Sequence, residues 1–452
     1  MNIEGKHILV VGLGRTGLAL ARYLKTKAAR VTVTDTATEK ELKSNVQLLI
    51  DMGIHMELGQ HQTASFTAAD LILLSPGVPH TLDPIQKGRE KGIPVLGELE
   101  FASRFIDQPM AAVTGTNGKT TTTALLGEML NRSGIDVFVG GNIGNPLIGY
   151  VAKGQPAQAA VIEISSFQLD TIDTFKPRVA VLLNISEDHL DRYPDFNAYV
   201  ESKGKIFKNQ APEDIAIINR QDSVSREIAK GIRSSIWYVN AQSETHGAVI
   251  EEDRIVFHTP VTGTLILNRS DIRLSGRHNM ENVAAACLAA FAMGGTLDGC
   301  RSALNAFMGL PHRQEEVAII SGVRYVNDSK ATNVDAVQKA LETYKDPVIL
   351  ILGGKDKGGD FKRLIPLIQQ KTKQVILSGE AVDTIAGAFG QEIRTESVST
   401  IAAAVSRARE FAAPGDVVLL SPGCTSYDEY ESYEERGEDF RRIVNAWHEE
   451  TA

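Results

Sequence analysis

The chain has 452 residues, with 47 Lys and Arg against 56 Asp and Glu, a formal net charge of −9, and 43% hydrophobic residues. This composition is typical of a globular protein, and at roughly 100 to 200 residues per domain the length predicts about two to four domains. The acidic balance argues against a general nucleic-acid binder, which usually presents a basic face. The longest apolar run, 283–293, falls short of the ~18 to 20 residues of a membrane span.

The compartment is predicted from the cysteines and the N-terminus. Cys287, Cys300 and Cys424 are few, unevenly spaced and without CxxC or neighbouring His patterns, so neither a disulfide framework nor a zinc site is indicated. Residues 1–5 lack the basic region and long apolar core of an export signal. We therefore expect the chain to work in the reducing cytoplasm, with no membrane span.

Strand and helix patterns alternate over residues 1–97. Strands are predicted at 7–11, 30–34 and 71–74, and a helix is predicted to begin at Thr16. This alternation predicts a small parallel sheet.

The same alternation continues through two further segments. In residues 98–308 it predicts strands at 111–113, 159–164 and 179–183, a helix over 119–131, and a buried apolar helix over 282–293. In residues 309–452 it predicts strands near Tyr325 and at 348–352, 374–377 and 416–420. Each segment is therefore expected to be α/β.

A glycine motif follows the first predicted strand. Gly12, Gly14 and Gly17 form GxGxxG, and Asp35 closes the next strand, where an acid that binds ribose would lie. The motif indicates a nucleotide site. Two alternatives stay open: a turn that merely needs glycine, and a site for a dinucleotide such as NAD.

A second glycine loop joins the predicted strand 111–113 to the predicted helix from Lys119. Glycines let backbone N–H groups face phosphate oxygens, the start of the helix adds its positive dipole end, Lys119 supplies charge, and Thr120 can bind Mg²⁺. Val113 stands where the GxxxxGK[ST] pattern has its first glycine, so this is a variant of the phosphate loop. ATP or GTP binding is predicted.

Acidic residues lie within and after the next strands. Glu163 lies inside an apolar strand, where a carboxylate must be paired or bound to a metal such as Mg²⁺; a salt bridge would serve equally well. The segment 184–193 follows another strand and contains Asp188, His189 and Asp191. Sites of α/β proteins gather at such strand ends, but a structural histidine and turn caps are the alternatives.

Compact sets of basic and polar side chains follow later in the chain. Each could reach an anion, or could instead be a helix cap, an exposed charge or half of an ion pair. The sets are His278-Asn279 with Asn282, His312-Arg313, Asp328-Ser329-Lys330 with Thr332, and Lys355 with Lys357.

Several short strings are similar to those of one enzyme family. They are TGTNGKTT (114–121), GGNIG (140–144), EISSFQLD (163–170), the Asp188-His189 segment, HNMENVAAA, GLPHR and NDSKATN. By these strings the chain resembles, nearly end to end, the Mur ligases, the ATP-dependent amide-forming enzymes that build the stem peptide of peptidoglycan.

Four more strings resemble the family members that add D-glutamate: VVGLGRTG, SPGVP (75–79), LGGKDKGGDF and SPGCTSYDEY (421–430). The Asn-Pro-Arg segment expected in relatives that add diaminopimelate or lysine is absent. The resemblance implies a ligase that adds D-glutamate to the L-alanyl carboxylate of UDP-N-acetylmuramoyl-L-alanine through an acyl phosphate. ADP and phosphate would be released, in cytoplasmic synthesis of a cell-wall precursor.

The resemblance also implies a fold of three α/β domains. A Rossmann-like N-terminal domain (1–97) would bind the uridine nucleotide, and a central phosphate-loop ATPase domain (98–308) with a mostly parallel sheet would bind ATP. A C-terminal Rossmann-like domain (309–452) would bind D-glutamate. We expect a monomer that acts on small molecules and binds no nucleic acid.

Site residues follow from the resemblance, position by position. The UDP-sugar site would contain Arg15, Thr16, Asp35, Thr36, Ser75, Pro76, Gly77, Asn142 and Ser165. ATP would contact Gly115, Thr116, Asn117, Gly118, Lys119, Thr120, Thr121, Asn279, Asn282, Arg313 and Asp328. The amino-acid site would contain Lys330, Thr332, Lys357, Ser426 and Tyr433. A basic residue often follows the Asp-Thr pair in these enzymes, whereas this chain has Ala37.

The resemblance also implies metal and catalytic residues. Thr120 and Glu163 would bind one Mg²⁺ and His189 a second. Family members carry a carbamylated lysine that supports metal binding; Lys203 is expected, with Lys205 as the alternative. Lys119, His189 and Lys203 are the expected catalytic residues.

Three other functions remain possible at this stage. The chain could be another member of the superfamily, such as a folylpolyglutamate synthase, which substrate trials would distinguish. It could be an NAD-dependent dehydrogenase, although this leaves TGTNGKTT unexplained. It could also be a nucleotide-gated switch, which would hydrolyse ATP slowly and form no amide.

Overall fold

The computed structural model describes residues 1–154, 157–190, 192–242, 245–274 and 276–451. The chain is α/β, with three sheets of mostly parallel strands, as predicted. Its contacts divide it into two compact units. The first unit contains residues 1–185, 200–271 and 281–305, and the second contains 186–199, 272–280 and 306–452.

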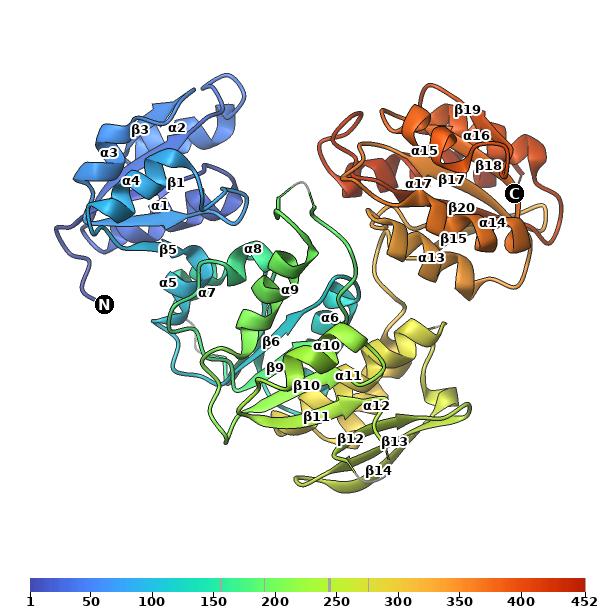
Figure 1. The fold of residues 1–452 in the computed structure, drawn as a ribbon, viewed down its shortest axis with the longest axis horizontal. Helices are drawn as coiled ribbons and strands as arrows, with labels where there is room; N and C mark the ends of the chain where they lie inside the picture. The colour runs from blue at the N-terminus through green and yellow to red at the C-terminus, as the bar shows by residue number, and fades with distance from the viewer. Residues whose placement is uncertain (155–156, 191, 243–244, 275, 452) are drawn as a thin grey trace. The chain divides into compact units, whose positions relative to one another are not determined.

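The N-terminal elements are β1 (His7–Val11), α1 (Arg15–Thr26), β2 (Arg30–Asp35), α2 (Lys43–Asp51), β3 (His55–Leu58), α3 (Thr63–Ala68), β4 (Leu71–Leu74), α4 (Asp83–Glu90), β5 (Val95–Gly97) and α5 (Glu98–Ser103). The strands form a parallel five-stranded sheet in the order β3-β2-β1-β4-β5 (Figure 1). Since β1 lies between β2 and β4, the loops after these three strands meet at one edge of the sheet.

The middle of the chain contains β6 (Met110–Thr114), α6 (Lys119–Arg132), β7 (Val137–Gly141), α7 (Leu147–Lys153), β8 (Ala159–Glu163), α8 (Ser166–Leu169), β9 (Val179–Leu182), α9 (Phe196–Gly204), η1 (Lys205–Phe207), β10 (Ile215–Asn219), α10 (Ser223–Ala229), β11 (Ser235–Val239), β12 (Gly247–Ile250), β13 (Arg254–Thr259), β14 (Gly263–Asn268), η2 (Arg269–Asp271), α11 (Arg277–Ala292) and α12 (Leu297–Ala306).

These strands form a nine-stranded sheet in the order β14-β13-β12-β11-β10-β9-β6-β8-β7. The strands from β7 to β12 in this order are parallel, and β13 and β14 extend the sheet as antiparallel strands, which the sequence patterns did not indicate. Because β6 lies between β9 and β8, the glycine loop after β6 is flanked by the ends of those two strands.

The C-terminal elements are β15 (Glu315–Ile320), β16 (Val323–Asn327), α13 (Val334–Thr343), β17 (Val348–Gly353), η3 (Phe361–Leu364), α14 (Ile365–Lys371), β18 (Thr372–Ser378), α15 (Val382–Phe389), β19 (Thr395–Ser397), α16 (Ile401–Phe411), β20 (Val417–Gly423) and α17 (Tyr433–Thr451). The six-stranded sheet has the order β15-β16-β20-β17-β18-β19, and only β15 is antiparallel to its neighbour.

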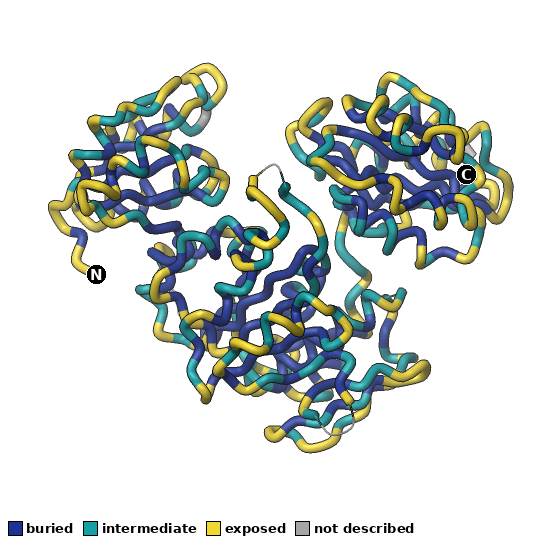
Figure 2. The backbone as a smooth tube through the Cα atoms, viewed as in Figure 1, coloured by how far each residue is buried: buried dark blue, intermediate teal, exposed yellow. Residues whose placement is uncertain are grey.

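Alternate residues of the C-terminal strands belong to two different hydrophobic clusters. Leu350 of β17 packs with α13, α14 and α15, whereas Ile349 and Ile351 pack with α16 and α17. Since successive side chains of a strand point to opposite faces, helices cover both faces of this sheet. Figure 2 shows the strands as mostly buried and the connecting loops as more exposed.

The apolar helix predicted over 282–293 is longer than expected. It is α11, which begins at Arg277, five residues earlier than predicted (282 − 277 = 5). The apolar run marks only its buried part, whereas the polar first turn contains His278 and Asn279. No helix of the described residues is long and apolar enough to cross a membrane.

Candidate active site

The loop between β6 and α6 has the backbone that a phosphate loop requires. Gly115 and Gly118 have φ angles of +150° and +87°, which side-chain-bearing residues rarely adopt. Space is also restricted at Gly118, because a Cβ there would lie 2.3 Å from Oδ1 of Asn282. Gly118 is the N-cap of α6 and has no side chain to cap the helix, and the N-terminus of a helix favours the binding of an anion.

Asn184, which follows β9, fixes this loop from the neighbouring strand. Its carbonyl accepts from the N–H of Thr116 (2.8 Å), its Oδ1 accepts from the N–H of Asn117 (2.9 Å), and its Nδ2 donates to the carbonyl of Asn117 (3.1 Å). Sequence reasoning did not include Asn184 among the site residues. Its position directly after a buried strand was the available signal.

Two lysines donate to the same carbonyl oxygen of the loop. Nζ of Lys119 lies 3.0 Å from the carbonyl oxygen of Gly115 and 2.8 Å from that of Thr116. Nζ of Lys203, on α9, lies 2.9 Å from the same oxygen of Gly115, and Lys203 is only 2% exposed. The structure thus brings these two predicted catalytic lysines together at the phosphate loop.

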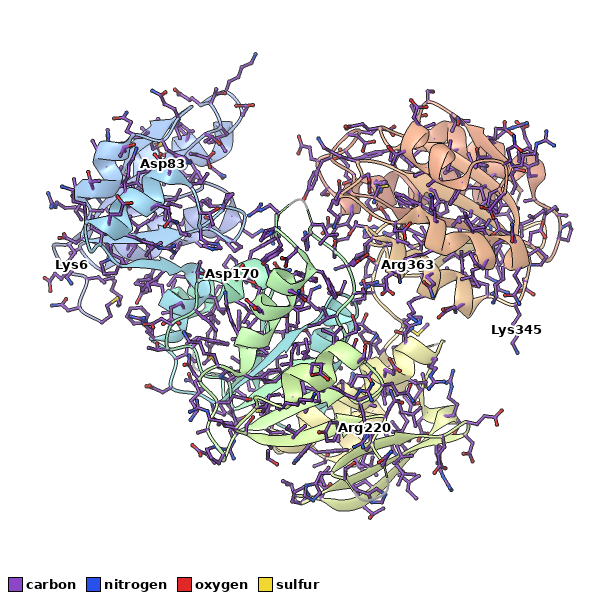
Figure 3. The ribbon with its side chains drawn as sticks, viewed as in Figure 1. Lys6, Asp83, Asp170, Arg220, Lys345 and Arg363 are labelled. Carbon is purple, nitrogen blue, oxygen red and sulfur yellow. The ribbon has the colours of Figure 1, made fainter. Side chains whose placement is uncertain are left out.

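Lys205, the alternative to Lys203 for carbamylation, has a different environment. Its ammonium group lies 2.6 Å from Oδ1 of Asp170, which is labelled in Figure 3, and its side chain is 40% exposed. Lys203, in contrast, is buried and lies at the phosphate loop, so the geometry favours Lys203.

Glu163, at the end of β8, is buried, and only one of its two carboxylate oxygens accepts a hydrogen bond from the described residues. Its Oε1 accepts from Nδ2 of Asn142 (2.9 Å). Its Oε2 is buried and has no hydrogen-bond partner among the described residues. An unpartnered buried carboxylate oxygen is costly unless a cation binds it. Asn142 follows β7, so neighbouring strands bring the two predicted residues together.

The chemistry of these residues fits Mg²⁺. No group of three or more His, Cys, Asp or Glu side chains that could hold a metal occurs in the described part of the chain. Mg²⁺ commonly binds through one or two carboxylates together with substrate phosphates and water. Glu163 and the hydroxyl of Thr120, the second residue of α6, would supply such ligands.

The first glycine motif is tightly packed against Ser75. A Cβ at Gly17 would lie 1.8 Å from the carbonyl oxygen of Gly12, and Oγ of Ser75 donates to that oxygen (2.9 Å). The two carboxylate oxygens of Asp35 accept from the N–H groups of Leu13 (2.6 Å) and Ala37 (2.8 Å). The structure therefore brings Asp35 and Ser75 together around the glycine turn, at the edge where Thr36, Pro76 and Gly77 also lie.

Two predicted UDP-sugar residues of the first unit have specific partners. Nη1 of Arg15 donates to the carbonyl of Gly144 (2.7 Å), in the loop that contains Asn142. Ser165 is the N-cap of α8 and forms a capping box with Gln168. Thr16 lies in the first turn of α1.

In the second unit, Asp188 is the centre of a polar cluster. Its Oδ1 accepts from Nζ of Lys357 (2.7 Å) and from the N–H of His189 (2.9 Å), and its Oδ2 accepts from Nδ2 of Asn333 (3.1 Å). Burial opposes ionisation of Asp188, but the charges of Lys357 and His189 outweigh it and lower its pKa to about 2.

Asp188 and Lys357 line one recess of the second unit, and His189 follows Asp188 in the chain. His189 has a φ of +56°, and its Nε2 lies 3.8 Å from Oδ2 of Asp188. Asp188, Thr332, Asn333 and Lys357 all line the recess. Asp191, the remaining acid of the predicted segment, lies outside the described residues.

Asp328 and Arg313 are predicted ATP contacts in the second unit. Asp328 is 1% exposed and accepts from Oγ of Ser421 (2.9 Å) and the N–H of Gln314 (3.1 Å). Burial raises the pKa of Asp328 to about 6, although Arg313 and these hydrogen bonds oppose the rise. Nε of Arg313 is buried without an acceptor in the described part of the chain, so this side chain can take an anionic or carbonyl ligand.

The other residues predicted for the amino-acid site lie near a buried arginine, Arg436, which the sequence analysis did not identify. Nζ of Lys330 lies 3.1 Å from the hydroxyl of Tyr433. Arg436, 1% exposed on α17, donates to the carbonyls of Ser329, Cys424 and Thr425 at 2.9 to 3.1 Å. Ser329 and Thr425 immediately precede Lys330 and Ser426, so Arg436 supports the backbone on which these two side chains lie.

The predicted residues are thus gathered into local sets. The first unit contains the phosphate loop with Lys119, Thr120, Thr121, Glu163, Asn142, Lys203 and Asn282, and the glycine turn with its UDP-sugar residues. The second unit contains His189, Asn279, Arg313, Asp328, Lys330, Thr332, Lys357, Ser426 and Tyr433.

Comparison with protein families matches three parts of the chain. The Mur ligase MurD-like N-terminal domain matches residues 6–97, the Mur ligase middle domain matches 113–290, and the Mur ligase glutamate ligase domain matches 312–424. The UDP-N-acetylmuramoylalanine–D-glutamate ligase of Desulfosudis oleivorans is 53% identical over 442 residues, which cover 98% of this chain and 96% of that protein. The enzyme of the same name from Geobacter metallireducens is 44% identical over 446 residues, 99% of this chain and 98% of that protein.

Solved structures agree on the fold. MurF from Acinetobacter baumannii has a TM-score of 0.62 at 18% identity and covers 97% of this chain and 91% of its own. The UDP-N-acetylmuramate-alanine ligase MurC from Thermotoga maritima has a TM-score of 0.59 at 18% identity and covers 98% of this chain and 100% of its own. The family matches and the ligases that are 44% and 53% identical set aside the NAD-dependent dehydrogenase and nucleotide-switch alternatives. The chain belongs to the Mur ligase family, and within it to the MurD-like group.

Proposed function

We propose that this chain is the ATP-dependent ligase that joins D-glutamate to the L-alanyl carboxylate of UDP-N-acetylmuramoyl-L-alanine, in the synthesis of peptidoglycan. It uses ATP and Mg²⁺. The observation that carries the proposal is the phosphate loop itself, where Lys119 and Lys203 share the Gly115 carbonyl, within a chain 53% identical to a protein named as such a ligase.

The chemistry requires activation of a carboxylate. A carboxylate reacts poorly with an amine, because its charge repels the nucleophile and oxide is a poor leaving group. An oxygen of the L-alanyl carboxylate therefore attacks the γ-phosphorus of ATP, the bond to the β-phosphate oxygen breaks, and ADP leaves. The D-glutamate amine attacks the resulting acyl phosphate, phosphate leaves, and the amine loses its proton as the amide forms.

The loop residues serve the first step. Lys119 and the N–H groups at the start of α6 offset the negative charge that spreads over the transferred phosphoryl group. Mg²⁺, held by Glu163 and Thr120, would supply further positive charge to the phosphates. We assign a second ion to His189.

Carbamylation of Lys203 belongs to the same proposal. Burial disfavours an ammonium group, and here two ammonium groups would approach one carbonyl oxygen. Neutral Nζ forms a bond to the carbon of CO₂ and loses one proton to solvent, which removes this repulsion and creates a carbamate anion that can support a metal. Intact mass measured without acid treatment should exceed the sequence mass by one CO₂, and Lys203→Ala should lose the increment whereas Lys205→Ala keeps it.

The assignment of substrates to domains is also proposed. Residues 1–97 would bind the uridine nucleotide, 98–308 ATP, and 309–452 D-glutamate. Each range contains one of the three sheets, which supports the division. We further propose that the enzyme is cytoplasmic, where ATP and the UDP-sugar are found.

The decisive test is phosphate release from ATP in the presence of UDP-N-acetylmuramoyl-L-alanine. D-glutamate, L-glutamate, L-lysine and meso-diaminopimelate are compared, with product mass as confirmation. Release and amide formation with D-glutamate alone are expected. Activity with another of these amino acids would reassign the amino-acid pocket, and no release with any of them would overturn the proposed function.

A further inference from the structure

Asn333 lies where the polar cluster around Asp188 meets the start of α13, in the second unit. Its Oδ1 accepts from the N–H of Ala336 (2.8 Å), which caps α13. Its Nδ2 donates to Oδ2 of Asp188 (3.1 Å). One amide side chain therefore joins the helix that follows Thr332 to the carboxylate that holds Lys357.

The Asp188 carboxylate is buried and has a partner on each side. Its side chain is 8% exposed and that of Lys357 is 17% exposed. The ammonium group of Lys357 and the backbone N–H of His189 donate to Oδ1, whereas Nδ2 of Asn333 donates to Oδ2, and Nε2 of His189 lies 3.8 Å from Oδ2. Hydrogen bonds to a buried charged group are short-range and directional, so a partner on one oxygen fixes where the other oxygen lies.

We propose that Asn333 is a positioning residue of the amino-acid pocket: its amide holds the Asp188 carboxylate where that carboxylate fixes the ammonium group of Lys357. The inference rests on the proposed function, because Lys357 is assigned to the D-glutamate pocket. Asn333 acts through Asp188 and Lys357 and is not itself assigned a contact with substrate. A lysine that is fixed in advance loses less side-chain freedom when it binds a substrate carboxylate.

The two roles of the Asn333 amide can be separated by substitution. Asn, Asp and Ser are similarly good N-caps, so Asn333→Ser and Asn333→Asp keep an acceptor for the N–H of Ala336. Serine is too short to replace the Nδ2 donor, and aspartate places a second carboxylate against Asp188. Asn333→Ala loses both the cap and the donor.

Steady-state kinetics are then measured for each substrate. In Asn333→Ser and Asn333→Asp, the KM for D-glutamate should rise about tenfold, the effect of losing a hydrogen bond to a charged group, while the KM for ATP stays near the wild-type value. Thr400→Ala is the matched control, because Thr400 caps α16 in the same unit by accepting from the N–H of Ala403. It should lower the melting temperature and leave the KM for D-glutamate unchanged.

Two outcomes would overturn the proposal. One is a wild-type KM for D-glutamate in both Asn333→Ser and Asn333→Asp, which would leave Asn333 as a cap alone. The other appears in the Asp188→Asn background: Asn333→Ser should add no further rise there, and a full additional rise would show that the effect does not pass through Asp188.

A readout without substrate keeps this inference distinct from the proposed function. The acetylation rate of Lys357 by acetic anhydride, followed by peptide mass spectrometry, should increase in Asn333→Ser and stay unchanged in Thr400→Ala. An unchanged rate in Asn333→Ser would contradict the positioning role. Failure of the wild-type enzyme to use D-glutamate would instead contradict the proposed function and leave this result standing.

Discussion

At the scale of single residues, Glu163 shows how a buried strand can present a carboxylate oxygen without a partner among the described residues. Sequence reasoning recognised that a carboxylate in an apolar strand needs a cation or a partner. The structure supplies Asn142 for one oxygen and leaves the other without a donor among the described residues. This partner, Asn142, follows β7, and α7 separates β7 from β8 in the chain. No local sequence pattern could therefore have paired Asn142 with Glu163.

Glu163→Gln should therefore weaken the binding of Mg²⁺ without removing the side-chain contact to Asn142. The glutamine oxygen can still accept from Nδ2 of Asn142, but the negative charge is lost. We expect half-maximal activity to require roughly tenfold more Mg²⁺. The measurement is activity against free Mg²⁺ concentration. Glu128→Gln, a part-exposed position on α6 paired with Arg132, is the control and should leave that curve unchanged.

At the scale of elements, the turn from β6 into α6 depends on glycine for two different reasons. Gly118 has a φ of +87° and also lacks space, since a Cβ would meet Asn282. Gly134, after the other end of α6, has a φ of +81° and open space around its Cβ position. Substitution of Gly134 therefore measures the free-energy cost of the backbone conformation alone, whereas substitution of Gly118 adds the cost of the steric clash with Asn282.

Gly118→Ala and Gly134→Ala should both lose about 1–2 kcal/mol of stability from the left-handed backbone. Only Gly118→Ala should also displace Asn282 and reduce ATP affinity. Chemical unfolding measures the first effect, and calorimetric titration with ATP measures the second. Equal losses of ATP affinity in the two variants would contradict the packing argument.

The contact between α5 and α7 contains a second buried carboxylate. Glu98 is 2% exposed, and its Oε1 accepts from the N–H of Ile148 (2.7 Å). Burial raises the pKa of Glu98 from 4.5 to about 7, although backbone hydrogen bonds from Ile148 and Leu147 oppose the rise. The folded state therefore binds this proton more tightly than the unfolded state does.

The stability that Glu98 contributes should consequently decrease as the pH rises from about 4.5 to about 7, and then level off. The total change is on the order of 3 kcal/mol. Urea unfolding between pH 5 and pH 8 should show the free energy of unfolding of the wild type falling relative to Glu98→Gln, which cannot titrate. Glu90→Gln, at an exposed position of α4, should run parallel to the wild type; a wild-type curve parallel to Glu98→Gln would refute the shift.

At the scale of the whole molecule, the proposed reaction needs one ATP site, one UDP-sugar site and one amino-acid site. One chain supplies the predicted residues of all three sites. We therefore expect a monomer. Light scattering after size-exclusion chromatography should give a mass near 49.0 kDa. Twice that mass, at a concentration near that of the activity assay, would show that the expectation is wrong.

Sequence by itself determined the α/β class, the phosphate loop and the family, because these depend on short-range patterns. An apolar strand, a glycine turn and a helix start with Lys119 and Thr120 are contiguous, so their chemistry can be recognised without knowing what packs against them. The GxGxxG turn that begins at Gly12 is also a contiguous pattern. In the structure this turn packs closely against Ser75, where a side chain at Gly12 would not fit.

Only the tertiary structure decided which side chains share a site. Asn184 and Lys203 reach the phosphate loop from β9 and α9, and Arg436 reaches three carbonyls from α17. The order of strands in the sheet, and not their order in the chain, sets these distances. Burial likewise separates Lys203 from Lys205, two residues apart in sequence, because only packing determines which of two neighbouring ammonium groups is removed from water.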